Sequence, residues 1–472
     1  MYVEVNVGKV ELKKVKKLFQ ATDMTVGEPW KKIVLFTLPM LIGNIAQQLY
    51  NTVDSIVVGR YVGDNALAAV GSAGPIMNLL LVLFIGISMG ASILVSQYFG
   101  AKQRENLSYT IGNCIVLTAI SVVVIMVLSV IVVRPLLEVL KTPDTIIDWC
   151  TSYLLIMFLG VVGTAYYNIL SGVLRGLGDA FSSLVYLLVA TVLNIILDLL
   201  FVAKFGMGVS GVALATVIAQ FISALLCFRR LTQLTDIFDL KLEYMKLKKL
   251  YANGIVNLGL PSGLTQAIFS MAMIVVQSLT NSFGEMFIAA NVIIMRVDGF
   301  AMLPNFSFGT AMTTYAGQNV GAKKIGRVVK GAKQGTLIAL LTTTTITGLI
   351  LIFGKQLMGI FTTTTELVEL SRRMMGIIAL GYIAMAVTQS LSGVMRGAGD
   401  TMTPMWISLF TTVAVRVPVA YGIAYFTRTP QLPNGRQECI FVSLLCSWLL
   451  GAVITTIFYI RGKWKKKALT YL

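Results

Sequence analysis

The sequence predicts an all-α polytopic membrane protein, with twelve transmembrane helices in two six-helix lobes. Of its 472 residues, 56% are hydrophobic and only 12% are charged, whereas soluble domains carry about 25% charged residues. Twelve apolar segments are long enough to cross a bilayer, which takes about 20 residues. An internal repeat relates the first six segments to the last six. These observations set the fold class.

The apolar segments follow one another along the whole chain with short polar connections. They are too long and too uniformly apolar for a membrane barrel, whose strands have about 10 residues of alternating polarity. We therefore expect helices. The predicted spans cover residues 33–57, 66–98, 108–133, 151–173, 182–203, 209–228, 255–281, 287–316, 331–353, 374–395, 402–426 and 438–460.

The distribution of Lys and Arg predicts that both termini are cytoplasmic. With the N-terminus inside, the inner segments hold 27 of the 38 Lys and Arg residues and the outer loops hold 9, the bias that is typical of membrane proteins. The predicted regions are a basic N-terminal segment 1–32, an N-lobe 33–228, a cytoplasmic linker 229–252, a C-lobe 253–461 and a basic tail 462–472. The first region has no cleavable signal pattern; it fits an amphipathic surface helix or a basic tail.

Composition also excludes several functional classes. The formal net charge of +17 follows from basic cytoplasmic loops, so we expect no nucleic-acid partner. The chain has no His, which removes the usual general base and the commonest metal ligand. The scattered cysteines match no metal motif and read as free thiols; they are Cys114, Cys150, Cys227, Cys439 and Cys446. We expect neither an enzyme nor a cofactor.

The repeat is visible as a shared motif in the two halves. Ser-Gly-Val-Leu-Arg-Gly-Leu-Gly-Asp at 171–179 recurs as Ser-Gly-Val-Met-Arg-Gly-Ala-Gly-Asp at 392–400, and Gly-Ala-Lys at 100–102 recurs at 321–323. Six spans per half give a parallel pseudo-two-fold repeat, an arrangement used by transporters. The glycines of the longer motif predict tight cytoplasmic turns; a phosphate-binding loop is the alternative, but the spacing differs from the known motif.

Polar residues inside the spans are the candidate functional site. Asn194 and Asp198 lie one helical turn apart in an apolar run, so they share a face. Asp54 and Thr216 fall at a similar depth in other spans, counted at about 1.5 Å per residue. An ionisable residue within a membrane span is a functional-site hypothesis by default. The alternative for each is a structural hydrogen bond between helices.

The second half lacks this acidic set. The repeat places valines opposite Asn194 and Asp198, and the second half instead carries Arg296, Asp298 and Arg416 inside its spans. Arg296 and Asp298 are two residues apart and do not face each other on one helix. These three residues fit either a structural ion pair or the lining of a substrate cavity.

Together these features resemble the multidrug and toxic compound extrusion (MATE) family over nearly the whole chain from about Pro29. The resemblance rests on Leu-Pro at 38–39, Val-Asp-Ser at 53–55, the twin glycine-rich loops and the Asn194/Asp198 pair. The acidic first half looks like the DinF-like branch, and the chain is similar to MepA-type bacterial exporters. The resemblance implies two lobes around a central cleft, and export of amphipathic, mostly cationic compounds by alternating access.

The resemblance also implies roles for individual residues. The DinF-like ion-coupling positions fall on Asp54, Asn194, Asp198 and Thr216, and the proline that bends the first helix falls on Pro39. The coupling ion would be a proton or sodium, the latter at Asp54, Asn194 and Asp198. The C-lobe departs from the NorM-like pattern, since its acidic pair is not matched.

We thus expect an antiporter of the bacterial plasma membrane, acting as a monomer on small amphipathic molecules. The alternative is a lipid-linked oligosaccharide flippase of related architecture, for which Arg296 and Arg416 would supply cationic groups. The sequence leaves open the choice between proton and sodium and the range of substrates.

Overall fold

The computed structural model describes residues 21–139 and 142–467. Within them, eleven helices are long and apolar enough to cross a membrane, and the number is twelve if one bent helix pair counts as a single span. The all-helical prediction is confirmed. Most of the predicted basic N-terminal segment 1–32 and the last residues of the tail 462–472 lie outside the described residues.

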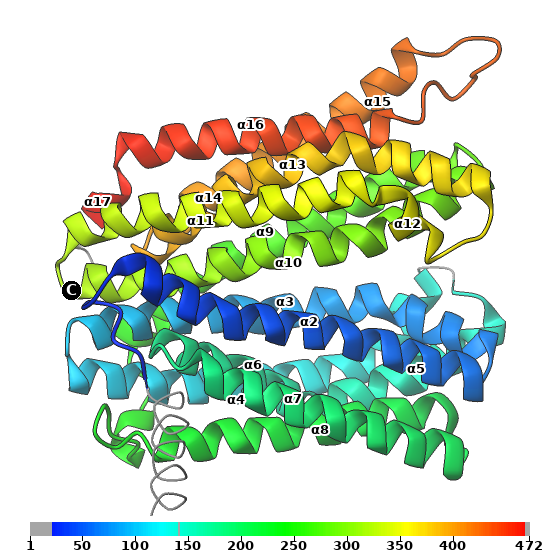
Figure 1. Ribbon diagram of the computed structural model, residues 1–472. Helices are drawn as coiled ribbons and strands as arrows, with labels where there is room; N and C mark the ends of the chain where they lie inside the picture. Colours follow the sequence, from blue (N-terminus) through cyan, green and yellow to red (C-terminus); the bar gives the residue numbers. More distant parts are fainter. Residues whose placement is uncertain (1–20, 140–141, 468–472) are drawn as a thin grey trace, which may run out of the picture. The chain divides into compact units, whose positions relative to one another are not determined.

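The chain divides into two compact units (Figure 1). Among the described residues, the first unit holds 21–24, 38–139 and 142–263, and the second holds 25–37 and 264–467. The predicted lobe boundaries are a different division, drawn from the repeat, and stay a prediction. In the first unit lie most of α2 (Pro29–Tyr61), then α3 (Asp64–Gly100), α4 (Arg104–Val139), α5 (Asp144–Leu159), α6 (Val161–Gly176), α7 (Ala180–Asp198), the π-helical η1 (Leu199–Lys204), α8 (Gly208–Thr232), the short η2 (Leu242–Met245) and the start of α9 (Lys249–Asn281).

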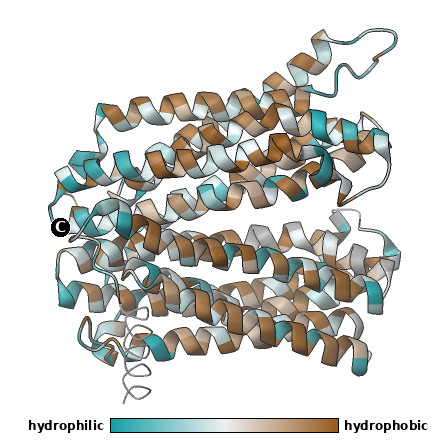
Figure 2. Ribbon diagram, in the orientation of Figure 1, coloured by the Kyte–Doolittle hydropathy of each residue, from teal (hydrophilic) through white to brown (hydrophobic). Residues whose placement is uncertain are grey.

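The second unit repeats this order of long helices. It holds the rest of α9, then α10 (Glu285–Gly321), α11 (Ile325–Ile352), α12 (Gly354–Gly359), α13 (Thr365–Gly397), α14 (Met402–Leu409), the π-helical η3 (Phe410–Arg416), α15 (Val417–Phe426), α16 (Cys439–Arg461) and α17 (Trp464–Lys467). Figure 2 shows that the long helices are mostly hydrophobic along their middle turns, with hydrophilic residues gathered toward their ends. Helices suit a bilayer because every backbone group is hydrogen-bonded within the segment.

The sequence repeat reappears in the helix boundaries. Helices α3 and α10 have 37 residues each, and each is followed two residues later by a lysine with positive φ, 57° at Lys102 and 58° at Lys323. The fourth span differs between the halves. It is bent by 51° between α5 and α6 in the first half, whereas α13 is one continuous helix of 33 residues in the second.

The two glycine-rich loops form tight turns at the ends of α6 and α13. Gly178 and Gly399 have φ of 85° and 93°, a conformation that strongly favours glycine. The aspartates that follow bond to the first turn of the next helix: Asp179, the N-cap of α7, accepts hydrogen bonds from Ser182, and Asp400, one residue before the N-cap of α14, accepts them from Thr403. Each also holds a cation, Arg230 at 2.9 Å and Lys467 at 2.7 Å. Both loops are therefore structural turns.

Helices α2 and α9 each pass from one unit to the other beside a proline. The boundary in α2 falls between residues 37 and 38, next to Pro39, and the boundary in α9 falls between residues 263 and 264, near Pro261. Proline removes a backbone hydrogen bond and weakens the helix locally. Both helices nevertheless continue through their prolines.

Candidate functional site

The first unit brings the four sequence-predicted coupling residues together. Asp54 lies on α2, Asn194 and Asp198 lie on the last turn and a half of α7, and Thr216 lies on α8. Asn194 and Asp198 are 1% and 0% exposed, although both are polar. Three helices thus direct polar side chains to one buried point within an apolar bundle.

The amide of Asn194 links the two carboxyl groups. With its nitrogen turned toward them, Nδ2 donates to Asp198 Oδ2 at 3.0 Å and to Asp54 Oδ1 at 3.3 Å, while Oδ1 accepts from the backbone N–H of Thr216 at 3.3 Å. This orientation satisfies both ends of the amide. The carboxyl groups of Asp54 and Asp198 also lie within hydrogen-bonding distance of each other.

Such a pair of carboxyl groups is suited to binding a proton. Two ionised carboxylates in contact repel strongly, and one proton shared between them removes the repulsion. In addition, Asp198 Oδ1 is buried and has no hydrogen-bond partner. A buried polar atom without a partner is costly, so the cluster is short of one donor or cation as it stands.

A sodium ion would use the same oxygens differently. Its ligands would be the carboxylates of Asp54 and Asp198, the Asn194 carbonyl oxygen and the Thr216 hydroxyl. In the hydrogen-bonded arrangement, however, Asn194 presents its N–H₂ group to the carboxylates, and this group cannot bind a cation. In the opposite amide orientation Nδ2 contacts Thr216 Oγ1 at 3.4 Å and the amide oxygen faces the carboxylates, so the donor set accommodates a proton in one orientation and sodium in the other.

Two tyrosines that the sequence analysis did not single out belong to this cluster. The Tyr50 hydroxyl lies 3.1 Å from Thr216 Oγ1, and Tyr153 of α5 lies within electrostatic range of both aspartates. Tyr50 is four residues before Asp54, hence on the same face of α2, and that spacing was a usable signal. No sequence feature pointed to Tyr153, since its position depends on how α5 packs.

The backbone changes its hydrogen-bond pattern directly after Asp198. Helix α7 ends at Asp198 and continues as the π-helix η1 from Leu199 to Lys204. A π-helical turn widens the helix and occurs frequently at functional sites. In the second half a π-helix again adjoins an intramembrane charge, because η3 ends at Arg416.

The residues predicted for the second half do not form a comparable cluster. Arg296 is exposed on α10. Asp298 and Arg416 are within electrostatic range of each other, yet Asp298 Oδ1 and Arg416 Nε are both buried without a hydrogen-bond partner. Among the described residues, no ion pair joins these two side chains. The structure is compatible with both roles predicted for these residues, a structural ion pair and the lining of a substrate cavity.

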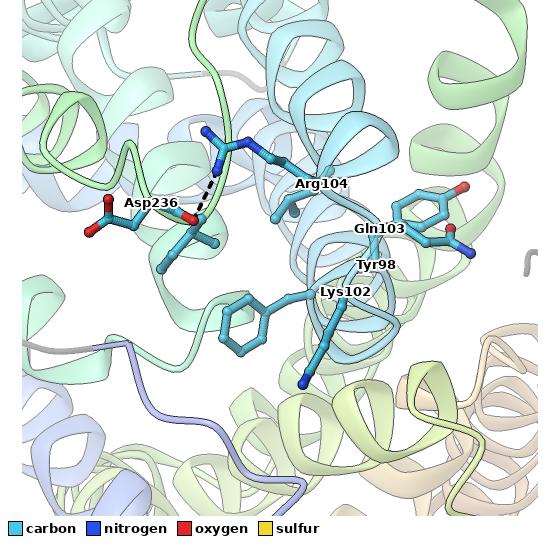
Figure 3. A pocket seen from close by; sticks show the side chains of 8 residues that line it. Tyr98, Lys102, Gln103, Arg104 and Asp236 are labelled. Atoms are coloured by element: carbon cyan, nitrogen blue, oxygen red, sulfur yellow. Dashed lines mark hydrogen bonds between the residues drawn. The ribbon is translucent and has the colours of Figure 1, made fainter.

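Outside the spans, the linker after α8 is clamped to the first unit beside a surface cavity. The cavity, about 250 Å³, is lined by Tyr98, Lys102 and Asp236 among others (Figure 3). Arg104 donates to the Asp236 carbonyl at 3.0 Å, seen as the dashed line, and forms a two-pronged ion pair with Asp239 at 2.8 and 2.9 Å. These contacts anchor the linker. None of the four predicted coupling residues (Asp54, Asn194, Asp198 and Thr216) lines this cavity.

Comparison with known proteins fits this arrangement of two repeated halves. A family model described as MatE matches the chain twice, over residues 39–200 and 261–422. The chain belongs to the MATE family. Each match begins at the proline of a first span, Pro39 or Pro261, and the two together cover well over half of the chain. As a member of the MATE family, it is a multidrug efflux antiporter and not an enzyme.

Individual MATE relatives cover nearly the full length. The chain is 30% identical over 452 residues to the probable multidrug resistance protein YoeA of Bacillus subtilis, covering 94% of this chain and 96% of that one. A more distant relative, the multidrug export protein MepA of Staphylococcus saprophyticus, is 22% identical over 83% of this chain and 86% of its own. A crystal structure described as MATE in complex with MaL6 superposes with a TM-score of 0.87 at 22% identity, covering 94% and 98%. That structure shows the shared fold.

Proposed function

We propose that this MATE antiporter exports amphipathic, mostly cationic compounds across a bacterial plasma membrane in exchange for protons, with the exchange controlled by Asp54, Asn194 and Asp198. The observation that carries the proposal is the buried pair of carboxyl groups held by one amide, with a carboxylate oxygen left without a partner. The names of the relatives YoeA and MepA support drug export. The inside position of both termini and assignment to the DinF-like branch belong to the same proposal.

The exchange follows from different affinities of the two conformations for ion and substrate. A ligand shifts a conformational equilibrium only by its differential affinity for the two states. A proton entering the cluster removes the repulsion between Asp54 and Asp198 and lets α2 and α7 approach. We propose that Pro39, at the weak point of α2, lets that approach alter the rest of the helix.

Sodium is the second candidate ion, at the same residues. Rotation of the Asn194 amide would offer four oxygen ligands, and hard cations prefer oxygen. The close approach of the two carboxyl groups favours the proton. The family assignment favours drug export over the flippase alternative.

Ethidium efflux from proteoliposomes tests the proposal. The purified chain is reconstituted, and efflux is followed under an imposed proton gradient, then under a sodium gradient at equal pH on both sides. We expect efflux with the proton gradient alone. Asp198→Asn should remove it, while Asp148→Asn, an exposed carboxylate paired with Arg134, should behave as wild type. Undiminished proton-driven efflux in Asp198→Asn would overturn the proposed role of the cluster.

A further inference from the structure

A small cavity inside the second unit has a chemistry quite different from that of the acidic cluster. Its volume is about 50 Å³, and it lies between α9, α13, the segment α14–η3 and α16. Its wall combines one cation, several hydroxyl groups and one indole ring. The residues that matter here are Thr388, Ser392, Arg396, Ser408, Thr412 and Trp448.

The cation is Arg396, whose charge has no counter-ion in the described part of the chain. Its Nε is buried and has no hydrogen-bond partner. The nearest acidic residue in sequence, Asp400, is already held by Lys467 at 2.7 Å and accepts a hydrogen bond from Thr403 of α14. A guanidinium does not lose its proton in proteins. The residue is half-buried by accessible surface, and its buried, unpaired Nε can donate to an anion in the cavity.

The hydroxyl groups supply the remaining donors that an anion needs. Ser392 and Thr412 are 4% and 2% exposed, and no hydrogen bond within residues 21–139 and 142–467 involves either hydroxyl. Buried hydroxyl groups normally have a partner. Both line the same cavity as Arg396, so two hydroxyl groups and the unpaired Arg396 Nε border one space.

The first half shows why the cavity exists. At the repeat offset, Thr388, Ser392 and Arg396 correspond to Tyr167, Ser171 and Arg175. There, Arg175 Nη1 donates to Ser171 Oγ at 2.6 Å, and the buried Tyr167 side chain lies beside both. In the second half a threonine takes the place of the tyrosine ring. The lost ring volume leaves a space next to the arginine.

We propose that this cavity binds a small inorganic anion of halide size, with Arg396 as its charge partner and the Ser392 and Thr412 hydroxyls as hydrogen-bond donors. A water molecule needs about 10–15 Å³ by this measure, so 50 Å³ holds a halide with one or two waters. The site is independent of the cation-coupling cluster. It lies in the other compact unit and carries the opposite charge.

Quenching of Trp448 by iodide gives a direct test, because this indole lines the cavity. The full-length protein is placed in nanodiscs of neutral phosphatidylcholine, in gluconate buffer of constant ionic strength. We expect a saturable component of quenching in the wild type that chloride displaces. Trp448→Phe should remove the component, since the remaining tryptophans report only collisional quenching.

Variants separate binding from folding. Thr388→Tyr restores the side chain found in the first half, and we expect it to fold and to weaken iodide binding at least tenfold by filling the space. Arg396→Gln should abolish the saturable component. The matched control Arg175→Gln, at the equivalent place in the other half, should retain it with unchanged affinity.

Two results would overturn the proposal. One is quenching that rises linearly with iodide and is equal in the wild type and Thr388→Tyr. The other is loss of halide binding in anionic lipid. If the wild type no longer binds iodide in phosphatidylglycerol nanodiscs, the cavity binds a lipid phosphate and not a halide.

Discussion

The two halves of the molecule share a scaffold and differ in their buried charges. Helices α3 and α10 are of equal length, and both glycine-rich loops end in an aspartate that accepts hydrogen bonds from the first turn of the next helix and holds a cation. Yet Asn194 and Asp198 correspond to Val415 and Val419. The repeat preserves the turns that both halves share, whereas the buried pair of carboxyl groups, which we propose couples transport to an ion, occurs in the first half.

Each half also places a π-helix beside its intramembrane charge, η1 after Asp198 and η3 before Arg416. The widened turn is therefore common to both halves, whereas the sign of the adjoining charge is opposite. The proposed anion cavity lies in the same half as Arg416 but is built on a different cation, Arg396, with Thr412 of η3 in its wall.

The largest expected effect comes from removing the carboxyl pair. Asp54→Asn and Asp198→Asn should each reduce proton-driven ethidium efflux at least tenfold, because each leaves its partner without a carboxyl group with which to share a proton. Residues that act as one unit give non-additive losses. The double variant should accordingly be no worse than either single variant. Losses that multiply would show two independent sites.

Placing a carboxylate at the equivalent position of the second half should lower the stability of the protein and should not restore efflux to Asp198→Asn. Val419→Asp places a carboxylate where Asp198 lies in the repeat, but without an Asn194 or an Asp54 beside it. A carboxylate in a membrane span costs about 2.5–3.5 kcal/mol, so the melting temperature in detergent should fall by several degrees. Val419→Asn is the control for shape. Restored efflux in an Asp198→Asn background would break the contrast between the halves.

The Asp298 and Arg416 pair can be resolved by a double-mutant cycle on stability. If the two stabilise each other across α10 and η3, Asp298→Asn and Arg416→Met should each destabilise the protein. The double variant should then recover about 1–2 kcal/mol relative to the sum of the two. A coupling energy near zero, with ethidium binding that becomes tighter in Arg416→Met and weaker in Asp298→Asn, would place them in the substrate cavity instead.

The smallest expected effect concerns Asp239, an aspartate of the linker. Unlike Asp54 and Asp198, it lies outside the membrane spans. Hydrogen bonds from Arg104 lower the pKa of Asp239. The ionised form is thus favoured in the folded state. Its stabilising effect is complete above the unfolded value of about 3.9 and is lost as the pH falls through the lowered folded value.

Proteolysis of the linker measures this effect. Cleavage between Leu234 and Lys248 should increase slightly as the pH drops below about 4, the unfolded value for an aspartate, and Arg104→Gln should show the same increase already at neutral pH. An acid-stable protease is the reagent. If the Arg104→Gln linker is as resistant as wild type at neutral pH, the clamp does not depend on this pair.

The fold was largely predictable because it depends on features spread over many residues, the apolar length of each segment and the internal repeat. Apolar length predicted the spans, and the repeat at an offset of 221 predicted two matched sets of helices. The bend between α5 and α6 was not predicted, although a glycine, Gly160, lies there. The equivalent Gly381 lies inside the unbent α13, so glycine alone did not distinguish the two cases.

The candidate site was predictable in its members and not in its geometry. Asp54, Asn194, Asp198 and Thr216 were identified because polar groups are rare in apolar runs and because the second half lacks them. The orientation of the Asn194 amide, the part of Tyr153 and the unpartnered oxygen of Asp198 depend on packing between helices. The Arg396 cavity depends on the absence of a ring at Thr388, which becomes visible only when both halves are placed side by side.

Proton release on substrate binding measures the proposed exchange at the carboxyl pair of Asp54 and Asp198. Ethidium is added to the detergent-solubilised protein in weakly buffered solution, and a pH dye records protons set free, at low and at high sodium. We expect proton release from the wild type at low sodium and none from Asp198→Asn, which should still bind ethidium. Equal proton release from the wild type and Asp198→Asn would contradict the proposed exchange.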